Sequence, residues 1–173
     1  GVVYRAIDSS LNRLVALKLL ASHLGQDPTA LARFHREASS AANLKHPNIA
    51  IIYRFGNHDG CPYIAMEWIE GRTLQTILTK QNTLSQEVAL MLCQQIANGL
   101  HYAHQQGVIH RDIKPANIII NANQQATIVD FGLAWLDSVS TLTTSGTIVG
   151  TPRYMSPEQL QGGSVDGRTD LYT

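Results

Sequence analysis

The chain has few charged residues and few cysteines, and both shortages restrict the classes of protein to which it can belong. Charged side chains make up 15% of its 173 residues, below the roughly 25% typical of globular domains. Thirteen basic residues balance thirteen acidic ones without a Lys/Arg block, which gives no electrostatic case for binding nucleic acid. Cys61 and Cys93 have no second Cys or His at metal-ligand spacing. A disulfide between them is one option, but reduced thiols better fit a cytosolic domain of this size.

Long apolar runs are also missing, since none approaches the roughly 20 residues of a membrane helix. We therefore expect no membrane contact within this segment and a cytoplasmic location, with any membrane anchor lying outside it. The chain begins at Gly1, without a start methionine or a signal peptide. Its 44% of hydrophobic residues is ordinary for a folded protein, and its length suits one domain or two small lobes that share a cleft.

The first seventy residues predict a small, mainly antiparallel sheet with one helix. Residues 2–8 and 14–20 are rich in β-branched and apolar residues and are expected to form a hairpin. Residues 27–44 are expected to be helical, with Asp27 as cap and Pro28 at the first helical position. Residues 49–69 then predict a second hairpin, which turns at "NHDG".

After "GRT", near residue 71, the pattern changes, and this is the only plausible boundary between two lobes. Residues 85–107 predict a helix with Ser85 as cap and Gly107 as terminator. The polar loop "HRDIKPAN" follows, and then two strand-like stretches, "NIII" and "ATIV", lie on either side of a polar turn. Residues 135–153 are rich in Ser, Thr and Gly without a period, which favours a long loop.

Lys18 and Glu37 are the first candidates for chemistry. Lys18 follows "VAL" on a predicted strand, and Glu37 lies on the helix that should cover that sheet. A Lys–Glu pair between strand and helix would hold the ammonium group in place to grip two phosphates. Taken alone, Lys18 would be a surface lysine on a strand, but the two residues together favour a functional role.

A second group of candidates surrounds "HRDIKPAN". The carboxylate of Asp112 could accept a hydrogen bond from an alcohol and orient it for attack, while Lys114 neutralises charge on a transferring phosphoryl group. Asn117 and Asp130 lie on either side of a hairpin and supply oxygen donors of the kind that Mg²⁺ prefers. Each residue alone has a structural alternative, such as a turn Asn or a surface salt bridge, but their combination favours chemistry.

Five motifs together carry a family resemblance: "VALK", Glu37, "HRDIKPAN", "DFG" and "GTPRYMSPE". This set resembles the protein kinase superfamily, and most closely its bacterial Ser/Thr kinases of eukaryotic type. The resemblance implies an α+β, two-lobed kinase fold. Residues 1–70 would form a small antiparallel-sheet N-lobe with one helix, and residues 71–173 a mainly helical C-lobe. The fold would be truncated at both ends, because Gly1 matches only the last glycine of the phosphate loop and the chain stops soon after Asp170.

The resemblance also assigns roles to individual residues. ATP and Mg²⁺ are the implied cofactors: Lys18 would contact the α- and β-phosphates and pair with Glu37, Asp112 would be the catalytic base, and Asn117 and Asp130 would hold Mg²⁺. His110 and Phe131 would belong to a hydrophobic spine, and Asp170 would brace the catalytic loop. The adenine would be bound by the residues that match the family's sandwich, gatekeeper and hinge positions, namely Val3, Ala16, Met66, Glu67 to Ile69, and Ile119.

Lys114 and Thr151 resemble the Ser/Thr class, so the implied partners are proteins with Ser or Thr. Thr151 could instead be a plain turn residue before Pro152. Arg111 resembles the arginine of kinases that are activated by phosphorylation of the activation loop, where Thr143 and Ser145 match the phosphosites of related kinases. A solvated Ser/Thr loop is the alternative to autophosphorylation at either site.

Two other functions remain open at this point. One is a pseudokinase or scaffold that binds nucleotide or partners without turnover, although Lys18, Glu37, Asp112, Asn117 and Asp130 are all intact. The other is a small-molecule kinase of related fold, although such enzymes generally lack a peptide-docking segment such as "GTPRYMSPE".

Overall fold

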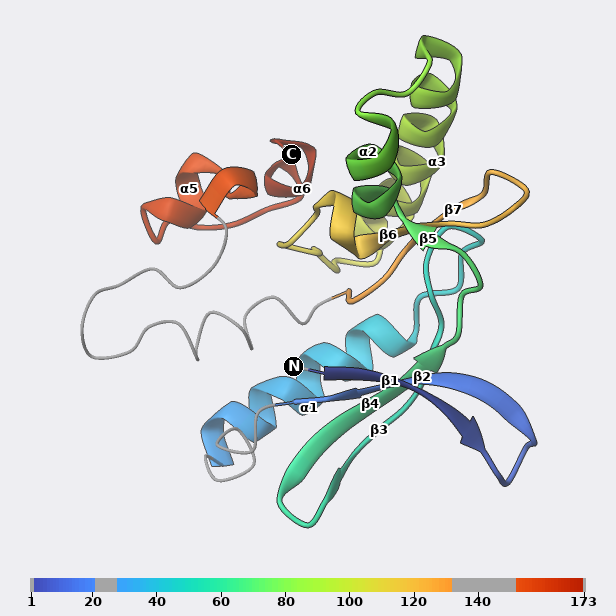
Figure 1. The fold of residues 1–173 in the computed structure, drawn as a ribbon. Helices are drawn as coiled ribbons and strands as arrows, with labels where there is room; N and C mark the ends of the chain where they lie inside the picture. The colour runs from blue at the N-terminus through green and yellow to red at the C-terminus, as the bar shows by residue number, and fades with distance from the viewer. Residues whose placement is uncertain (1, 21–27, 132–151, 173) are drawn as a thin grey trace.

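The computed structural model describes residues 2–20, 28–131 and 152–172. They form two parts, a four-stranded sheet with one long helix and a more helical part with a small second sheet (Figure 1). The predicted α+β, two-lobed kinase fold is confirmed by this arrangement. Within the described residues, no helix is long and apolar enough to cross a membrane. Cys61 and Cys93 are both free thiols, so the disulfide alternative does not hold.

The first sheet is built from two antiparallel hairpins. The first hairpin is β1 (Val2–Asp8) with β2 (Arg13–Leu19), and the second is β3 (Ile52–His58) with β4 (Cys61–Glu67). The strands lie in the order β1-β2-β4-β3, so the two hairpins join through β2 and β4. The second hairpin turns at Asp59 and Gly60, both of which have positive φ, in agreement with the turn predicted at "NHDG".

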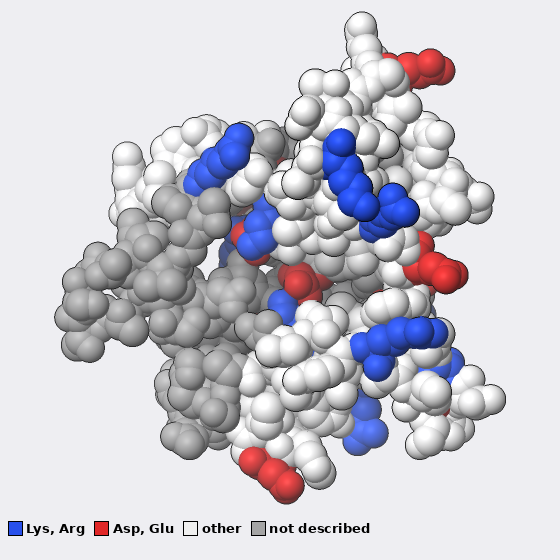
Figure 2. Space-filling view, viewed as in Figure 1, with Lys and Arg blue, Asp and Glu red and all other residues white. Residues whose placement is uncertain are grey.

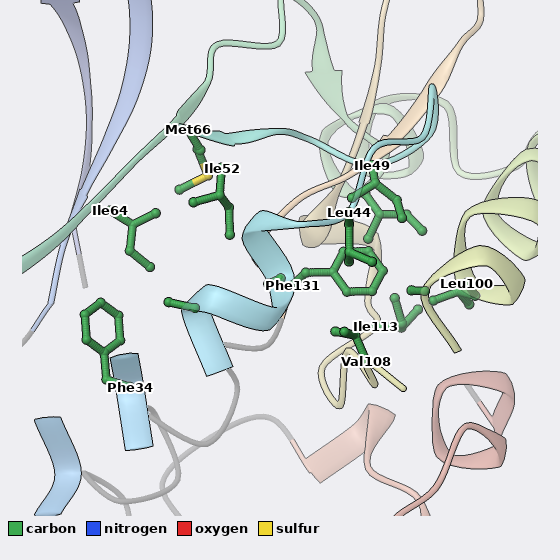
Figure 3. Close-up of a cluster of buried hydrophobic side chains, with 14 of the residues drawn as sticks. Phe34, Leu44, Ile49, Ile52, Ile64, Met66, Leu100, Val108, Ile113 and Phe131 are labelled. Carbon is green, nitrogen blue, oxygen red and sulfur yellow. The ribbon is translucent and has the colours of Figure 1, made fainter. Parts of the chain in front are cut away.

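Helix α1 (Pro28–Ala42) packs against this sheet through one apolar stripe. Phe34, Ala38 and Ala41 recur at helical spacing and are almost fully buried. They belong to a core that continues through Ile52, Ile64 and Met66 of the sheet (Figure 3). The predicted cap Asp27 lies outside the described residues.

The second part begins where the first sheet ends. Strand β5 (Arg72–Thr73) leads into helix α2 (Leu74–Gln81), and helix α3 (Gln86–Gln105) follows. As predicted, Ser85 caps α3 by accepting from the Val88 amide, and Gly107 ends it with a φ of 71°. Helix α2 was not predicted, because its short apolar pattern is weak and its cap, Thr73, is read as part of a turn.

The candidates Asp112, Lys114, Asn117 and Asp130 lie in the segments around the second sheet. Strand β6 (Ile118–Ile120) follows a 3₁₀ turn at Pro115–Asn117 and pairs with both β5 and β7 (Ala126–Ile128). A second 3₁₀ turn, Pro152–Tyr154, precedes the short helices α5 (Pro157–Leu160) and α6 (Arg168–Tyr172).

The stretch before β3 fastens the two parts together. The amide of Ala50 donates to the carbonyl of Ile128 (2.9 Å), and the amide of Ile128 donates to the carbonyl of Asn48 (2.8 Å). The buried Asn48 side chain adds a 2.7 Å bond to the carbonyl of Ala126. Leu100, Val108, Ile113 and Phe131 extend the core of α1 into the second part (Figure 3). The end of β7, and with it Asp130, is therefore held at a fixed place relative to the first sheet.

Candidate active site

The hollow between the two parts gathers charged side chains. Figure 2 shows acidic and basic groups meeting there, and further charged groups lie on the surface beside the hollow. Two segments of the second part supply this cluster, the loop 110–117 and the residues after β7, and Lys18 of β2 supplies it from the first sheet. The hollow brings together Lys18 and Asp130, which are 112 positions apart in sequence (130 − 18).

Asp112 lies at the centre of the charged groups that the second part supplies. Its carboxylate oxygen Oδ2 accepts from Lys114 Nζ at 2.6 Å and from Asn117 Nδ2 at 2.9 Å. Asn117 Nδ2 also donates to the Asp112 carbonyl at 2.8 Å. Lys114 and Asn117 therefore meet on one carboxylate oxygen of Asp112. Because Oδ2 is occupied, Oδ1 is the oxygen left to accept from an incoming hydroxyl.

A buried carboxylate on α6 holds the backbone of the same loop. Asp170, 3% exposed, accepts from the amides of His110 (2.8 Å) and Arg111 (2.7 Å). This confirms the bracing expected of Asp170. His104 contributes a third contact, at 2.8 Å from Nε2 to Oδ2, and sequence reasoning missed it because a histidine near the end of a helix carries no distinctive signal.

His110 is a packed residue whose two ring nitrogens are both bonded. Its ring is fully buried and meets Phe131 edge-on at 4.7 Å between centroids. Nε2 faces the Val129 carbonyl at 2.8 Å and must carry the proton, so Nδ1 accepts from the Asp112 amide at 3.2 Å. A proton on Nδ1 would point at the N–H of Asp112, and these two donors would repel each other. Burial lowers the pKa of His110 below its ordinary 6.5, although the Val129 carbonyl and nearby aspartates act in the opposite direction.

We expect acid to destabilise the protein through His110. The unfolded state binds the proton more readily than the folded state, so stability is fully present above pH 6.5 and falls as the pH drops below it. If the folded ring stays neutral, each pH unit below that value costs about 1.4 kcal/mol. Unfolding free energies of the full-length protein between pH 7.5 and 5.5 would show this slope.

The variant His110→Phe should be less stable overall but should lose this contribution to the slope. His58→Gln provides the control, because it also removes one histidine but at an exposed side chain outside the core. Equal slopes for the wild type and His110→Phe would contradict this explanation.

Asn117 and Asp130 offer oxygen donors at the same edge of the second sheet. The Val129 amide donates to the Asn117 carbonyl at 3.0 Å, which places Asp130 directly beside the loop. Because Nδ2 of Asn117 is bonded to Asp112, its amide oxygen is the atom left for a cation. One carboxylate and one amide oxygen suit Mg²⁺, which commonly takes its other ligands from water and phosphates. No group of three His, Cys, Asp or Glu side chains suited to a metal occurs in the described parts of the chain.

Asp130 also has an unusual backbone. Its φ is 66°, in the left-handed region that non-glycine residues adopt rarely, and Arg111 has a φ of 68°. Two such residues in one hollow point to geometry imposed by the surrounding contacts, as occurs at functional sites.

The predicted ion pair between Lys18 and Glu37 is wrong for this structure. Lys18 Nζ pairs instead with Asp130 Oδ2 at 2.8 Å, and the Glu37 oxygens each lie 3.1 Å from Arg111 Nη1. Lys18 is only 8% exposed, so a nearby carboxylate is required to balance its charge. The sequence identifies two cations and two anions, but the position of α1 against the sheet decides how they pair.

The residues assigned to adenine come from the first sheet, the segment after it and strand β6. Val3 pairs with Lys18 and Ala16 with Met66 in the sheet register, and Met66 is buried. Ile119 is half-buried and points to the opposite side of β6 from Ile118 and Ile120, which pack against α3. Their contact with a nucleotide stays a prediction.

The proposed hinge is tied to the loop before β3. The Glu67 amide donates to the Ile51 carbonyl at 2.8 Å, and Glu67 Oε2 accepts from the Ile51 amide at 3.2 Å. Ile69 lies two residues on and is half-buried. The Glu67 amide is therefore already bonded, so any contact of Glu67 with an adenine edge would use its carbonyl.

The segment after Thr151 contributes contacts that sequence reasoning missed. Thr151 itself lies outside the described residues, as do Thr143 and Ser145. Glu158 accepts from the Thr169 hydroxyl at 2.6 Å, and this bond lowers the pKa of Glu158. Gln159 reaches the loop 110–117, at 2.7 Å from the Arg111 carbonyl. The pattern S-x-x-Q at residues 156–159 signals a capping box, but it does not reveal the second contact.

Comparison with known proteins gives matches over the whole chain. The family model described as "Protein kinase domain" matches residues 1–173. A probable serine/threonine-protein kinase of Streptomyces coelicolor is 44% identical, over 99% of this chain and 26% of the relative. The serine/threonine-protein kinase PknB of Mycobacterium tuberculosis is 40% identical, over 99% of this chain and 28% of the relative. The chain thus spans about a quarter of the length of these relatives.

Solved structures give the same picture. The PknI kinase domain of Mycobacterium tuberculosis superposes with a TM-score of 0.76 at 32% identity. The match covers 98% of this chain and 64% of that structure. Sequence and fold therefore point to the same family.

Proposed function

This chain belongs to the protein kinase family, and from that premise we propose that it transfers the γ-phosphate of ATP to Ser and Thr hydroxyls of proteins. The observation that carries the proposal is the meeting of Lys114 and Asn117 on one oxygen of Asp112. It leaves a carboxylate oxygen at the hollow between the two parts, beside a cation that can neutralise a phosphoryl group.

Asp112 is proposed to act on the attacking hydroxyl. Oδ1 would accept its hydrogen bond, orient the oxygen toward the γ-phosphorus and take the proton as the new O–P bond forms, while the bond from the γ-phosphorus to the bridging oxygen breaks and ADP leaves. Lys114 is already within 2.6 Å of the other oxygen, so a small movement would bring its ammonium group to the transferring phosphoryl. Orientation and charge neutralisation would supply most of the rate, since the protein makes no covalent bond.

Lys18, Asn117 and Asp130 are proposed to hold the nucleotide. Lys18 would contact the α- and β-phosphates, and Asn117 and Asp130 would ligate Mg²⁺ through their oxygens. Bound Mg²⁺ would offset the charge of the phosphates. Val3, Ala16 and Ile119 would enclose the adenine from opposite sides, with Met66 and residues 67–69 along its edge. The lobes would be residues 1–70 and 71–173.

The observed ion pairs support a regulated enzyme. With Glu37 on Arg111, Lys18 lacks the partner expected for gripping phosphates. A phosphate carries a charge of about −1.5 to −2 and would compete with Glu37 for Arg111. We propose Thr143 or Ser145 as the position of this phosphate, added by autophosphorylation. Glu37 would then be released to pair with Lys18.

One experiment tests both parts of this proposal. The full-length protein, incubated with ATP and Mg²⁺, should phosphorylate a protein substrate on Ser or Thr, and chelation of Mg²⁺ should abolish transfer. Mass spectrometry of the protein itself should find phosphate on residues 138–147, and activity should rise as this phosphate accumulates.

Absence of transfer would overturn the enzyme and favour the pseudokinase or scaffold, which the intact site does not favour. Transfer without any phosphate in this segment would overturn only the regulation.

A further inference from the structure

Gln159 on α5 links the end of the described chain to the loop that carries Asp112. Its Oε1 accepts from the Ser156 amide at 3.0 Å, and its Nε2 donates to the Arg111 carbonyl at 2.7 Å. The first bond needs an acceptor and the second a donor, so both fix the same orientation of the side-chain amide. Gln159 therefore contacts the loop 110–117 in addition to its part in the capping box.

The peptide group that Gln159 contacts is the one directly before the Asp112 side chain. Its carbonyl belongs to Arg111 and is held by Gln159, while its N–H belongs to Asp112 and is held by His110 Nδ1 at 3.2 Å. Arg111 has a φ of 68°, and its own amide is bonded to Asp170. A strained conformation of this kind persists only when the contacts around it enforce it. Gln159 supplies the one side-chain contact to the carbonyl end of this peptide group within the described residues.

We propose that Gln159 is a positioning residue for phosphoryl transfer. By holding the peptide plane between Arg111 and Asp112, it sets the direction in which the Asp112 carboxylate points. It also connects the orientation of the Asp112 carboxylate to residues 152–159. The loop 110–117 and this segment would therefore reach the geometry needed for phosphoryl transfer together. This inference rests on the proposed kinase function.

The variant Gln159→Glu separates positioning from helix capping. Glutamate at this place of a capping box accepts from the Ser156 amide as well as glutamine does, but it has no donor for the Arg111 carbonyl. In the full-length protein we expect Gln159→Glu to lower kcat about tenfold, the typical value of one hydrogen bond between neutral groups. The KM for ATP should change less than twofold, and the midpoint of thermal unfolding should stay close to that of the wild type.

Two variants control for charge and for loss of the cap. Gln161→Glu makes the same change at an exposed residue two positions further on and should leave kcat unchanged. Gln159→Met adds no charge but removes both polar atoms, so it should lower kcat as far as Gln159→Glu and also lower the unfolding midpoint. A second measurement is amide hydrogen exchange at Asp112, which should become faster in both Gln159 variants and not in Gln161→Glu.

The outcomes are distinct. A wild-type kcat for Gln159→Glu, or unchanged exchange at Asp112, would overturn the positioning role. A decrease in kcat that only follows loss of folded protein would assign Gln159 to stability and would also overturn it. If the wild type itself transfers no phosphate, it is the proposed function that fails.

Discussion

Asp112→Asn is expected to lower kcat about 10³-fold, within the range of general-base catalysis. Asparagine keeps the size of the side chain and can still contact Lys114 and Asn117, which lie 2.6 and 2.9 Å from Oδ2 in the wild type. It cannot take a proton from the attacking hydroxyl. Steady-state transfer to a protein substrate should show the loss in kcat, while the affinity for ATP should change little because Asp112 faces the hydroxyl.

The control is Glu87→Gln, the same change from carboxylate to amide at an exposed residue in the first turn of α3. It should have the kcat of the wild type. An Asp112→Asn variant with more than a tenth of the wild-type kcat would remove Asp112 from the role of base. A loss shared with Glu87→Gln would point to a general effect of charge.

Asp130→Asn should have an effect of similar size for a different reason. The carboxylate pairs with Lys18 at 2.8 Å and is the charged oxygen donor that we propose for Mg²⁺ together with the amide oxygen of Asn117. Its loss removes several kcal/mol of charge stabilisation, which corresponds to a decrease of about 10³-fold in transfer. Binding of a fluorescent ATP analogue should also lose most of its dependence on Mg²⁺.

Asp166→Asn is the matched variant for this test, because Asp166 is a surface aspartate paired with Arg168. Its Mg²⁺ dependence should equal that of the wild type. If the analogue binds Asp130→Asn with the same gain from Mg²⁺ as it binds the wild type, Asp130 is not a ligand of the cation.

Local rules were enough for most of the elements. The hairpins, α1 and α3 follow from side-chain periodicity and from turn and cap residues, because these depend on neighbours within a few positions. Helix α2 was missed, since its apolar pattern is short. Its stability comes from packing on β6 and on the 3₁₀ turn that precedes β6. The meeting of Asp112, Lys114 and Asn117 was predictable as well, because all three lie within six residues of one loop.

The sequence by itself determined the chemical inventory, namely the carboxylates, the amide oxygen and the lysines, and the family to which they belong. Only the tertiary structure decided which groups meet. Lys18 pairs with Asp130 and Glu37 with Arg111, and Gln159 donates to the carbonyl of Arg111. The physical reason is the distance along the sequence over which each interaction acts. Periodicity and capping act over one or two helical turns, whereas an ion pair or a hydrogen bond between segments 48 to 112 positions apart depends on packing of the whole core.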